Sequence, residues 1–92
     1  MSSLKLQALQ LAANDVIAAI DATPPEHVSD DVLASIQNQM IFIREKAAAG
    51  KSPSAELPAG TTFTYAMLAS RELASPDELV LKVKIDKVQS LF

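Results

Sequence analysis

The segment 29–50 constrains the fold most, because it predicts a helix with a signal at each end. At its start, Ser29 or Asp30 can accept a hydrogen bond from a free backbone amide, and at its end Gly50 can adopt the left-handed conformation that closes a helix. Between them, apolar residues recur at steps of three and four and form one stripe that faces a core. The stripe consists of Leu33, Ile36, Met40, Ile43 and Ala47.

Phe42 falls outside this stripe, because on a helix it shares its row with the polar residues Ser35, Gln39 and Lys46. Two interpretations follow. A neighbouring helix covers the ring, as is usual for apolar side chains. Alternatively, the ring is an exposed aromatic anchor for a partner protein, the kind of residue that dominates binding energy at interfaces.

The composition predicts one folded domain, 1–92, with an aliphatic core, because hydrophobic residues make up 49% of the chain and aromatic residues only 4%. The chain has no cysteine, so disulfides and thiolate metal sites are excluded, which is compatible with the cytoplasm. We expect a cytoplasmic protein, since the N-terminus lacks a secretion signal and no apolar run approaches the ~18 residues that cross a bilayer.

The net charge of −3 is unevenly distributed along the sequence. The first 46 residues hold three cationic and six acidic residues, whereas the remainder holds five of each. An acidic half repels phosphate backbones, so we expect no nucleic-acid partner and favour a basic protein surface. A membrane-surface role is also disfavoured, because a membrane anchor combines a strongly basic face with large apolar residues.

The spacing of apolar residues and the positions of the prolines predict two further helices. The first runs from residue 3 or 4 to about 22 and ends at a Thr-Pro-Pro sequence. The second runs from 63 to about 73, with Thr61 or Thr62 as its cap. The connector 51–60 contains two prolines and a short helical turn over 54–57.

The C-terminal segment fits two interpretations. Ser75 as a cap, proline at the first helical position and Glu78 three residues after the cap make a strong helix start. Residues 81–85 alternate as a half-buried strand would, although Leu81, Ile85 and Val88 also have helical spacing. We predict a helix, because a strand would have no partner strand. The expected fold is therefore all-α, a small antiparallel bundle of about four helices; α+β is the alternative if 79–88 is a strand.

The sequence shows no constellation typical of an enzyme. His27 is the only histidine, and we expect it in an exposed loop rather than as a metal ligand or general base. Asp30 and Asp31 are adjacent and point in different directions on a helix, while Asp77 and Glu78 belong to the predicted helix start. We therefore expect no enzyme activity, no cofactor and no metal site.

Short motifs over residues 35–83 resemble a known family. In order they are Ile36-Gln-Asn-Gln-Met-Ile-Phe-Ile-Arg44, Gly50, Leu57, Tyr65-Ala66, Arg71-Glu72-Leu73 and Asp77-Glu-Leu79. This succession resembles small helical immunity proteins of bacterial type VI secretion systems, in particular the one that neutralises an NAD(P)-degrading toxin. The resemblance implies an antitoxin that binds the catalytic domain of a cognate effector, an NAD(P)-degrading or other nucleotide-targeting toxin, and blocks its active site.

We therefore expect a stoichiometric inhibitor, since a rigid helical surface can bind a partner with little ordering cost. The residues that we predict to contribute to its partner-binding interface are Gln39, Phe42, Tyr65, Arg71 and Glu72. The alternative is a self-associating structural or adaptor protein. Its homodimer interface would be closed by Ile41, Phe42, Leu79 and Val83.

Overall fold

The computed structural model describes residues 3–26, 28–57, 63–73 and 76–91, with side chains except at positions 3, 54 and 77. Its elements are α1 (Ser3–Ala22), α2 (Asp30–Ala48), η1 (Pro53–Glu56), α3 (Tyr65–Glu72), η2 (Pro76–Glu78) and α4 (Leu79–Ser90), where η denotes a 3₁₀ helix. The described ranges contain no strand. The prediction of an all-α fold is confirmed, and the α+β alternative for 79–88 is wrong.

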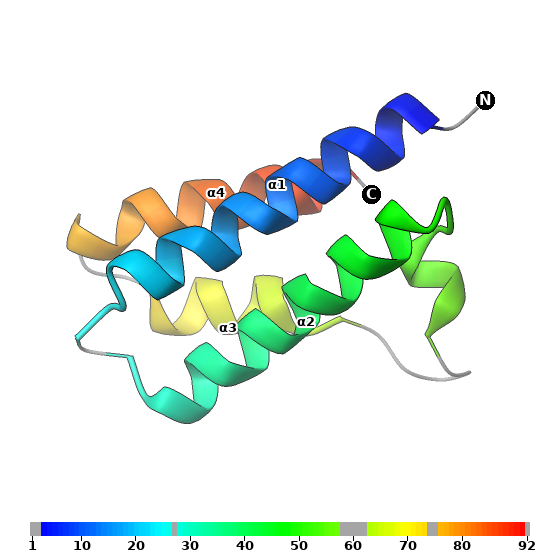
Figure 1. Cartoon of the computed structure of the whole chain (residues 1–92). Coiled ribbons are helices and arrows are strands. Elements are labelled where there is room, and N and C mark those ends of the chain that lie inside the picture. Colours follow the sequence, from blue (N-terminus) through cyan, green and yellow to red (C-terminus); the bar gives the residue numbers. More distant parts are fainter. Residues whose placement is uncertain (1–2, 27, 58–62, 74–75, 92) are drawn as a thin grey trace.

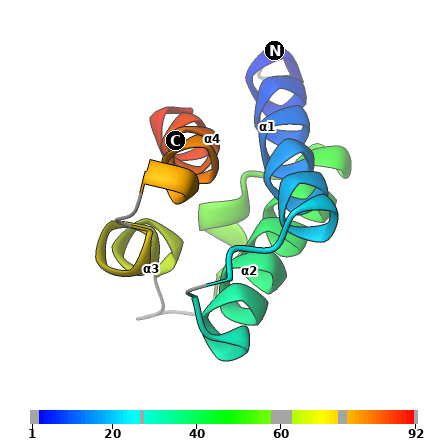
Figure 2. The same ribbon diagram turned by 90° about the vertical axis from the view of Figure 1, so that its left-hand side faces the viewer.

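The four α-helices form a ring in which each contacts two neighbours (Figures 1 and 2). α1 contacts α2 and α4, and α3 completes the ring between α2 and α4. Neighbours run antiparallel, so the C-terminal ends of α1 and α3 lie at the same end of the bundle as the N-terminal ends of α2 and α4 (Figure 1). Within the described residues α2 and α4 occupy diagonal corners, and their backbones do not come within 8 Å of each other between Cα atoms.

Both ends of α2 form as the sequence predicts. The hydroxyl of Ser29 accepts a hydrogen bond from the backbone N–H of Val32 at 3.3 Å. Gly50 has a φ of 78°, the left-handed conformation that only glycine adopts without strain. All five residues of the predicted stripe are buried, with 7% or less of their surface exposed. The interior therefore lies along one face of α2.

The core is aliphatic and closes between helices that approach closely. Ala13 of α1 is completely buried, and small residues at such positions allow a neighbouring helix to come near. The other buried residues of the predicted α1 stripe are Leu9, Val16 and Ile20, while Leu6 is half-buried. α4 contributes Leu81, Ile85 and Val88, the residues with helical spacing.

The start of α3 differs from the prediction. The helix begins at Tyr65 rather than at Phe63, and the side chain of the cap residue Thr64 does not cap it. The predicted caps Thr61 and Thr62 lie outside the described residues. The later start has a physical reason. The side chain of Gln39 in α2 accepts hydrogen bonds from the backbone N–H groups of Thr64 and Tyr65, so the helix begins where these amides find an acceptor.

The start of α4 also differs. A 3₁₀ turn over Pro76–Glu78 precedes the α-helix, which begins at Leu79, and no side chain caps that α-helix. The predicted cap Ser75 and the loop residue His27 lie outside the described residues. The predicted capping box pairs Glu78 with Ser75, so it also lies outside the described residues; Glu78 itself makes no side-chain cap hydrogen bond to α4.

Candidate functional site

Gln39 of α2 fixes the N-terminal end of α3. Its Oε1 atom accepts hydrogen bonds from the backbone N–H groups of Thr64 at 2.8 Å and Tyr65 at 2.9 Å. Its Nε2 atom donates to the hydroxyls of Thr64 at 2.9 Å and Ser35 at 3.2 Å. Helices leave their first amides without partners, and here another helix supplies the acceptor. The polar atoms of Gln39 are therefore engaged within the protein.

An aromatic cluster lies beside this cap. The rings of Phe42 and Phe63 meet edge to face with their centroids 5.9 Å apart, and Phe63 lies 5.8 Å from Tyr65. The ammonium of Lys46 lies 5.5 Å from the centroid of Phe42, within the range of a cation–π interaction. Phe42 is half-buried, and the segment before α3 covers it in part. The covering ring belongs to the segment before α3 rather than to a helix, and the role of Phe42 as an anchor for a partner protein stays a prediction.

Tyr65 belongs to the interior. Only 1% of its surface is exposed, and its hydroxyl donates a hydrogen bond to the Oε1 atom of Gln89 at 2.9 Å. Burial raises the pKa of Tyr65 from 10.0 to about 12, because the phenolate would lose its hydration. The side chain is therefore neutral at physiological pH and is not part of the described surface.

Arg71 and Glu72 are exposed in the last turn of α3. With a rise of ~1.5 Å per residue, these two residues lie ~9–10 Å along the helix axis from Tyr65. The structure thus brings Gln39, Phe42 and Tyr65 together at the start of α3 and places the charged pair at its other end. Participation of these five residues in an interface stays a prediction.

One end of the bundle is strongly acidic. We call it the acidic end; it comprises the last turn of α1, the segment up to the first turn of α2, the last turn of α3, and η2 with the start of α4 (Figure 1). Its described charged side chains are six carboxylates and one guanidinium: Asp21, Glu26, Asp30, Asp31, Glu72, Glu78 and Arg71. Within the described structure, none of the six carboxylates forms an ion pair.

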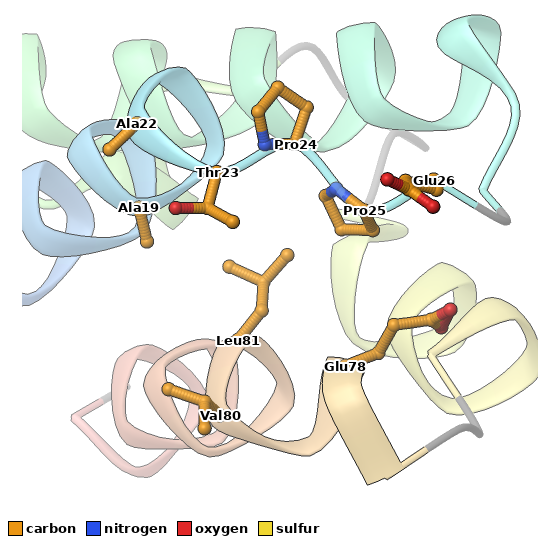
Figure 3. A pocket seen from close by; sticks show the side chains of 9 residues that line it. All are labelled: Ala19, Ala22, Thr23, Pro24, Pro25, Glu26, Glu78, Val80 and Leu81. Atoms are coloured by element: carbon orange, nitrogen blue, oxygen red, sulfur yellow. The ribbon is translucent and has the colours of Figure 1, made fainter.

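A pocket of about 590 Å³ opens at the acidic end between α1 and α4 (Figure 3). Most of its wall is apolar, and two carboxylates share it. Glu26 is exposed, whereas only 4% of Glu78 is exposed. The lining residues are Ala19, Ala22, Thr23, Pro24, Pro25, Glu26, Glu78, Val80 and Leu81.

Sequence reasoning missed this pocket, because its walls come from segments more than fifty residues apart. The available signal was the alanine-rich end of the first helix, followed by two prolines and Glu26. The sequence pattern around Glu78 indicates only a helix start. Neither signal indicates a pocket until the antiparallel packing of α1 and α4 brings them together.

A second pocket, of about 460 Å³, lies along the same contact between α1 and α4. It is lined by Ala8, Leu11, Ala12, Asn14, Asp15, Ala18 and Lys87. Lys84 of α4 donates to the carboxylate of Asp15 at 2.9 Å. In contrast to the carboxylates of the first pocket, Asp15, the one carboxylate among the described lining residues, has a cationic partner on the opposite helix.

Among the described side chains, no three His, Asp or Glu residues lie close enough together to hold a metal ion. No helix in the described ranges has the length and apolar character needed to cross a membrane. Comparison with known protein families, characterised proteins and solved structures gives no match to this chain.

Proposed function

We propose that the protein is an immunity protein, a stoichiometric inhibitor in the bacterial cytoplasm that binds the catalytic domain of a cognate type VI secretion effector. The toxin would degrade NAD(P) or act on another nucleotide, as the family resemblance implies. The observation that carries the proposal is the acidic end, where six carboxylates accompany one guanidinium among the described side chains. No ion pair within the described structure neutralises those carboxylates.

The charge of this surface suits a toxin of the proposed class. Sites that bind phosphorylated nucleotides present arginine and lysine side chains and the N-terminal ends of helices. An acidic surface is complementary to such a site, and it accelerates association through long-range attraction. The inhibitor would therefore bind where the phosphates of the substrate bind and exclude the substrate.

The fold supports inhibition by a preformed surface. Gln39 joins α2 to α3 through hydrogen bonds to two backbone amides, and α3 carries Arg71 and Glu72 at the acidic end. Val80 contributes an apolar side chain there, with 67% of its surface exposed. Because the helices are already in place, binding loses little conformational entropy. We place the interface on the acidic end, with Arg71 and Glu72 in it.

Co-expression of the chain with the toxin's catalytic domain tests the proposal. We expect a one-to-one complex and full loss of toxin activity at equimolar inhibitor. Reversing two charges at the acidic end, Asp30→Lys with Asp31→Lys, should slow association at least tenfold at low salt. The matched control reverses two exposed glutamates outside this end, Glu45→Lys with Glu56→Lys. Failure to form a complex at micromolar concentrations would contradict the proposal.

A second candidate is the self-associating adaptor, which the outer face of α4 favours. Leu79, Val80 and Val83 expose 48%, 67% and 66% of their surfaces. The two other residues of the predicted dimer interface, Ile41 and Phe42, are half-buried on α2, at the diagonal corner of the ring. Ile41 and Phe42 therefore do not share one face with Leu79 and Val83, and a dimer centred on α4 would not include them. Light scattering distinguishes the candidates: a homodimer that persists at nanomolar concentration and dissociates in Val83→Lys supports the adaptor.

A further inference from the structure

Glu78 is the one buried charged residue of the described core. Only 4% of its surface is exposed, and it lies directly before α4 without capping that helix. Within the described residues its carboxylate forms no hydrogen bond and no ion pair. A carboxylate removed from water without a partner is destabilising. Stability of the free protein therefore does not account for Glu78.

The surroundings of Glu78 indicate which kind of group could pair with its carboxylate. Its side chain lines the pocket at the acidic end, on the side where Pro25 and Glu26 also lie (Figure 3). Among the described residues, those that line the pocket include two carboxylates and no lysine, arginine or histidine. The other described lining residues are two alanines, two prolines, one threonine, Val80 and Leu81. This site accordingly combines uncompensated negative charge with apolar walls.

A lysine or arginine side chain has the complementary chemistry. Its alkyl stem packs against apolar groups while its cationic head forms charge-assisted hydrogen bonds. An anion would be repelled by both carboxylates. We propose that this pocket receives a lysine or arginine side chain from the partner protein, with Glu78 as the buried anchor and Glu26 as a second acceptor at the surface. The identity of the partner as a protein rests on the proposed function.

The experiment uses the full chain and four small probes. Binding of Nα-acetyl-arginine-methylamide and its lysine equivalent is followed by amide chemical shifts in NMR titrations. The citrulline and norleucine equivalents serve as uncharged probes of similar shape. We expect the cationic probes to shift the amide signals of Ala19, Ala22 and Leu81 and to bind at least tenfold more tightly than the uncharged probes. Equal binding of charged and uncharged probes would overturn the inference.

Variants separate a binding role of Glu78 from a structural one. Glu78→Gln keeps the shape of the side chain and removes its charge. It should therefore weaken binding of the cationic probes at least tenfold and leave the thermal midpoint of unfolding unchanged or higher. Ala22→Leu fills the pocket from an exposed helical position and should abolish probe binding in a folded protein. Glu45→Gln, an exposed glutamate on α2, is the control and should change neither quantity. A lower thermal midpoint in Glu78→Gln with unchanged probe binding would show a structural role and overturn the inference.

The toxin domain provides the last measurement. Tenfold weaker binding of the toxin by Glu78→Gln supports the inference. If the toxin binds Glu78→Gln as tightly as the wild type, the inference fails while the proposed function stands. If the cationic probes bind through Glu78 and the toxin domain does not bind at all, the proposed function fails while the cation-selective pocket is supported.

Discussion

Substitution of Gln39 tests whether α3 depends on a cap supplied by α2. Gln39→Ala removes the oxygen that accepts from the amides of Thr64 and Tyr65, and it removes the amide that donates to two hydroxyls. The two hydroxyls can rotate toward water, but the two backbone amides are partly buried and lose their acceptor. Each unsatisfied buried donor costs about 1–3 kcal/mol, and partial access of water favours the lower values. We expect Gln39→Ala to lower the free energy of unfolding by roughly 2–4 kcal/mol.

Two matched variants isolate the acceptor. Gln39→Glu keeps an oxygen for both amides and adds negative charge at the N-terminal end of α3, where the helix dipole favours it by about 0.3–1 kcal/mol. We therefore expect it to cost less than ~1 kcal/mol. Ser35→Ala removes only the hydroxyl that accepts at 3.2 Å and should cost less than Gln39→Ala.

Urea denaturation followed by circular dichroism measures these differences, and amide hydrogen exchange locates them. In Gln39→Ala, the amides of Thr64 and Tyr65 should exchange faster, whereas those in the middle of α1 should change only with global stability. The reasoning would be refuted by a Gln39→Ala variant within ~0.5 kcal/mol of wild type, the range of a neutral surface change. Equal destabilisation by Gln39→Ala and Gln39→Glu would also refute it.

Three further predictions concern single residues. Tyr65 is the only tyrosine, so its near-ultraviolet absorbance should titrate near pH 12 in the folded protein, and a midpoint near 10 would contradict its burial. The pKa of Tyr65 is 10.0 in the unfolded chain, so its neutral form contributes about 3 kcal/mol to the free energy of unfolding below pH 10, and this contribution is lost by pH 12. Urea denaturation at each pH, with Tyr65→Phe as the control, should show this loss. Gly50→Ala should lower the free energy of unfolding by about 1 kcal/mol in urea denaturation. A Cβ at this position, with φ 78°, meets no atom within 4 Å, so the loss comes from backbone strain alone; an unchanged free energy would contradict this. In the same assay, Ile85→Ala should lower the free energy of unfolding by about 2–5 kcal/mol, because Ile85 is buried, and Val83→Ala by less than ~0.5 kcal/mol, because Val83 is exposed. Similar losses in the two variants would contradict the finding that Ile85 faces the core and Val83 faces outward.

The two ends of α2 could be predicted because their signals act within a few residues. Ser29 bonds an amide three positions later, and Gly50 needs only its own backbone freedom. The start of α3 could not be predicted in the same way. The acceptor for the amide of Thr64 lies 25 positions earlier in the sequence, and only the packing of α2 against α3 brings it there. The sequence predicts Gln39 as an interface residue, whereas in the structure its polar atoms form hydrogen bonds within the protein.

The C-terminal segment shows how burial separates two patterns that coexist in one sequence. Strict alternation over 81–85 would place Leu81, Val83 and Ile85 on one face of a strand. The structure buries Leu81 and Ile85 and leaves 66% of Val83 exposed, as a helical period requires. The helix is favoured because its apolar stripe packs against both α1 and α3. The same choice leaves Leu79 and Val83 on the outer face of the bundle.

The acidic end could not be predicted by counting charges along the sequence, because the second half of the chain is balanced. Antiparallel packing brings Glu72 and Glu78 to the end that also carries Asp21 and Glu26, whereas Lys84 lies farther along α4 beside Asp15. Acidic residues suit the N-terminal ends of α2 and α4, but Asp21 and Glu72 lie near the C-terminal ends of α1 and α3, where the helix dipole disfavours negative charge by about 0.3–1 kcal/mol. A hydrogen bond of 2.7 Å from Gln37 offsets part of this for Asp21. Together with the buried Glu78, these positions concentrate negative charge beyond what stability favours, which is expected of a surface whose positive counterpart belongs to another molecule.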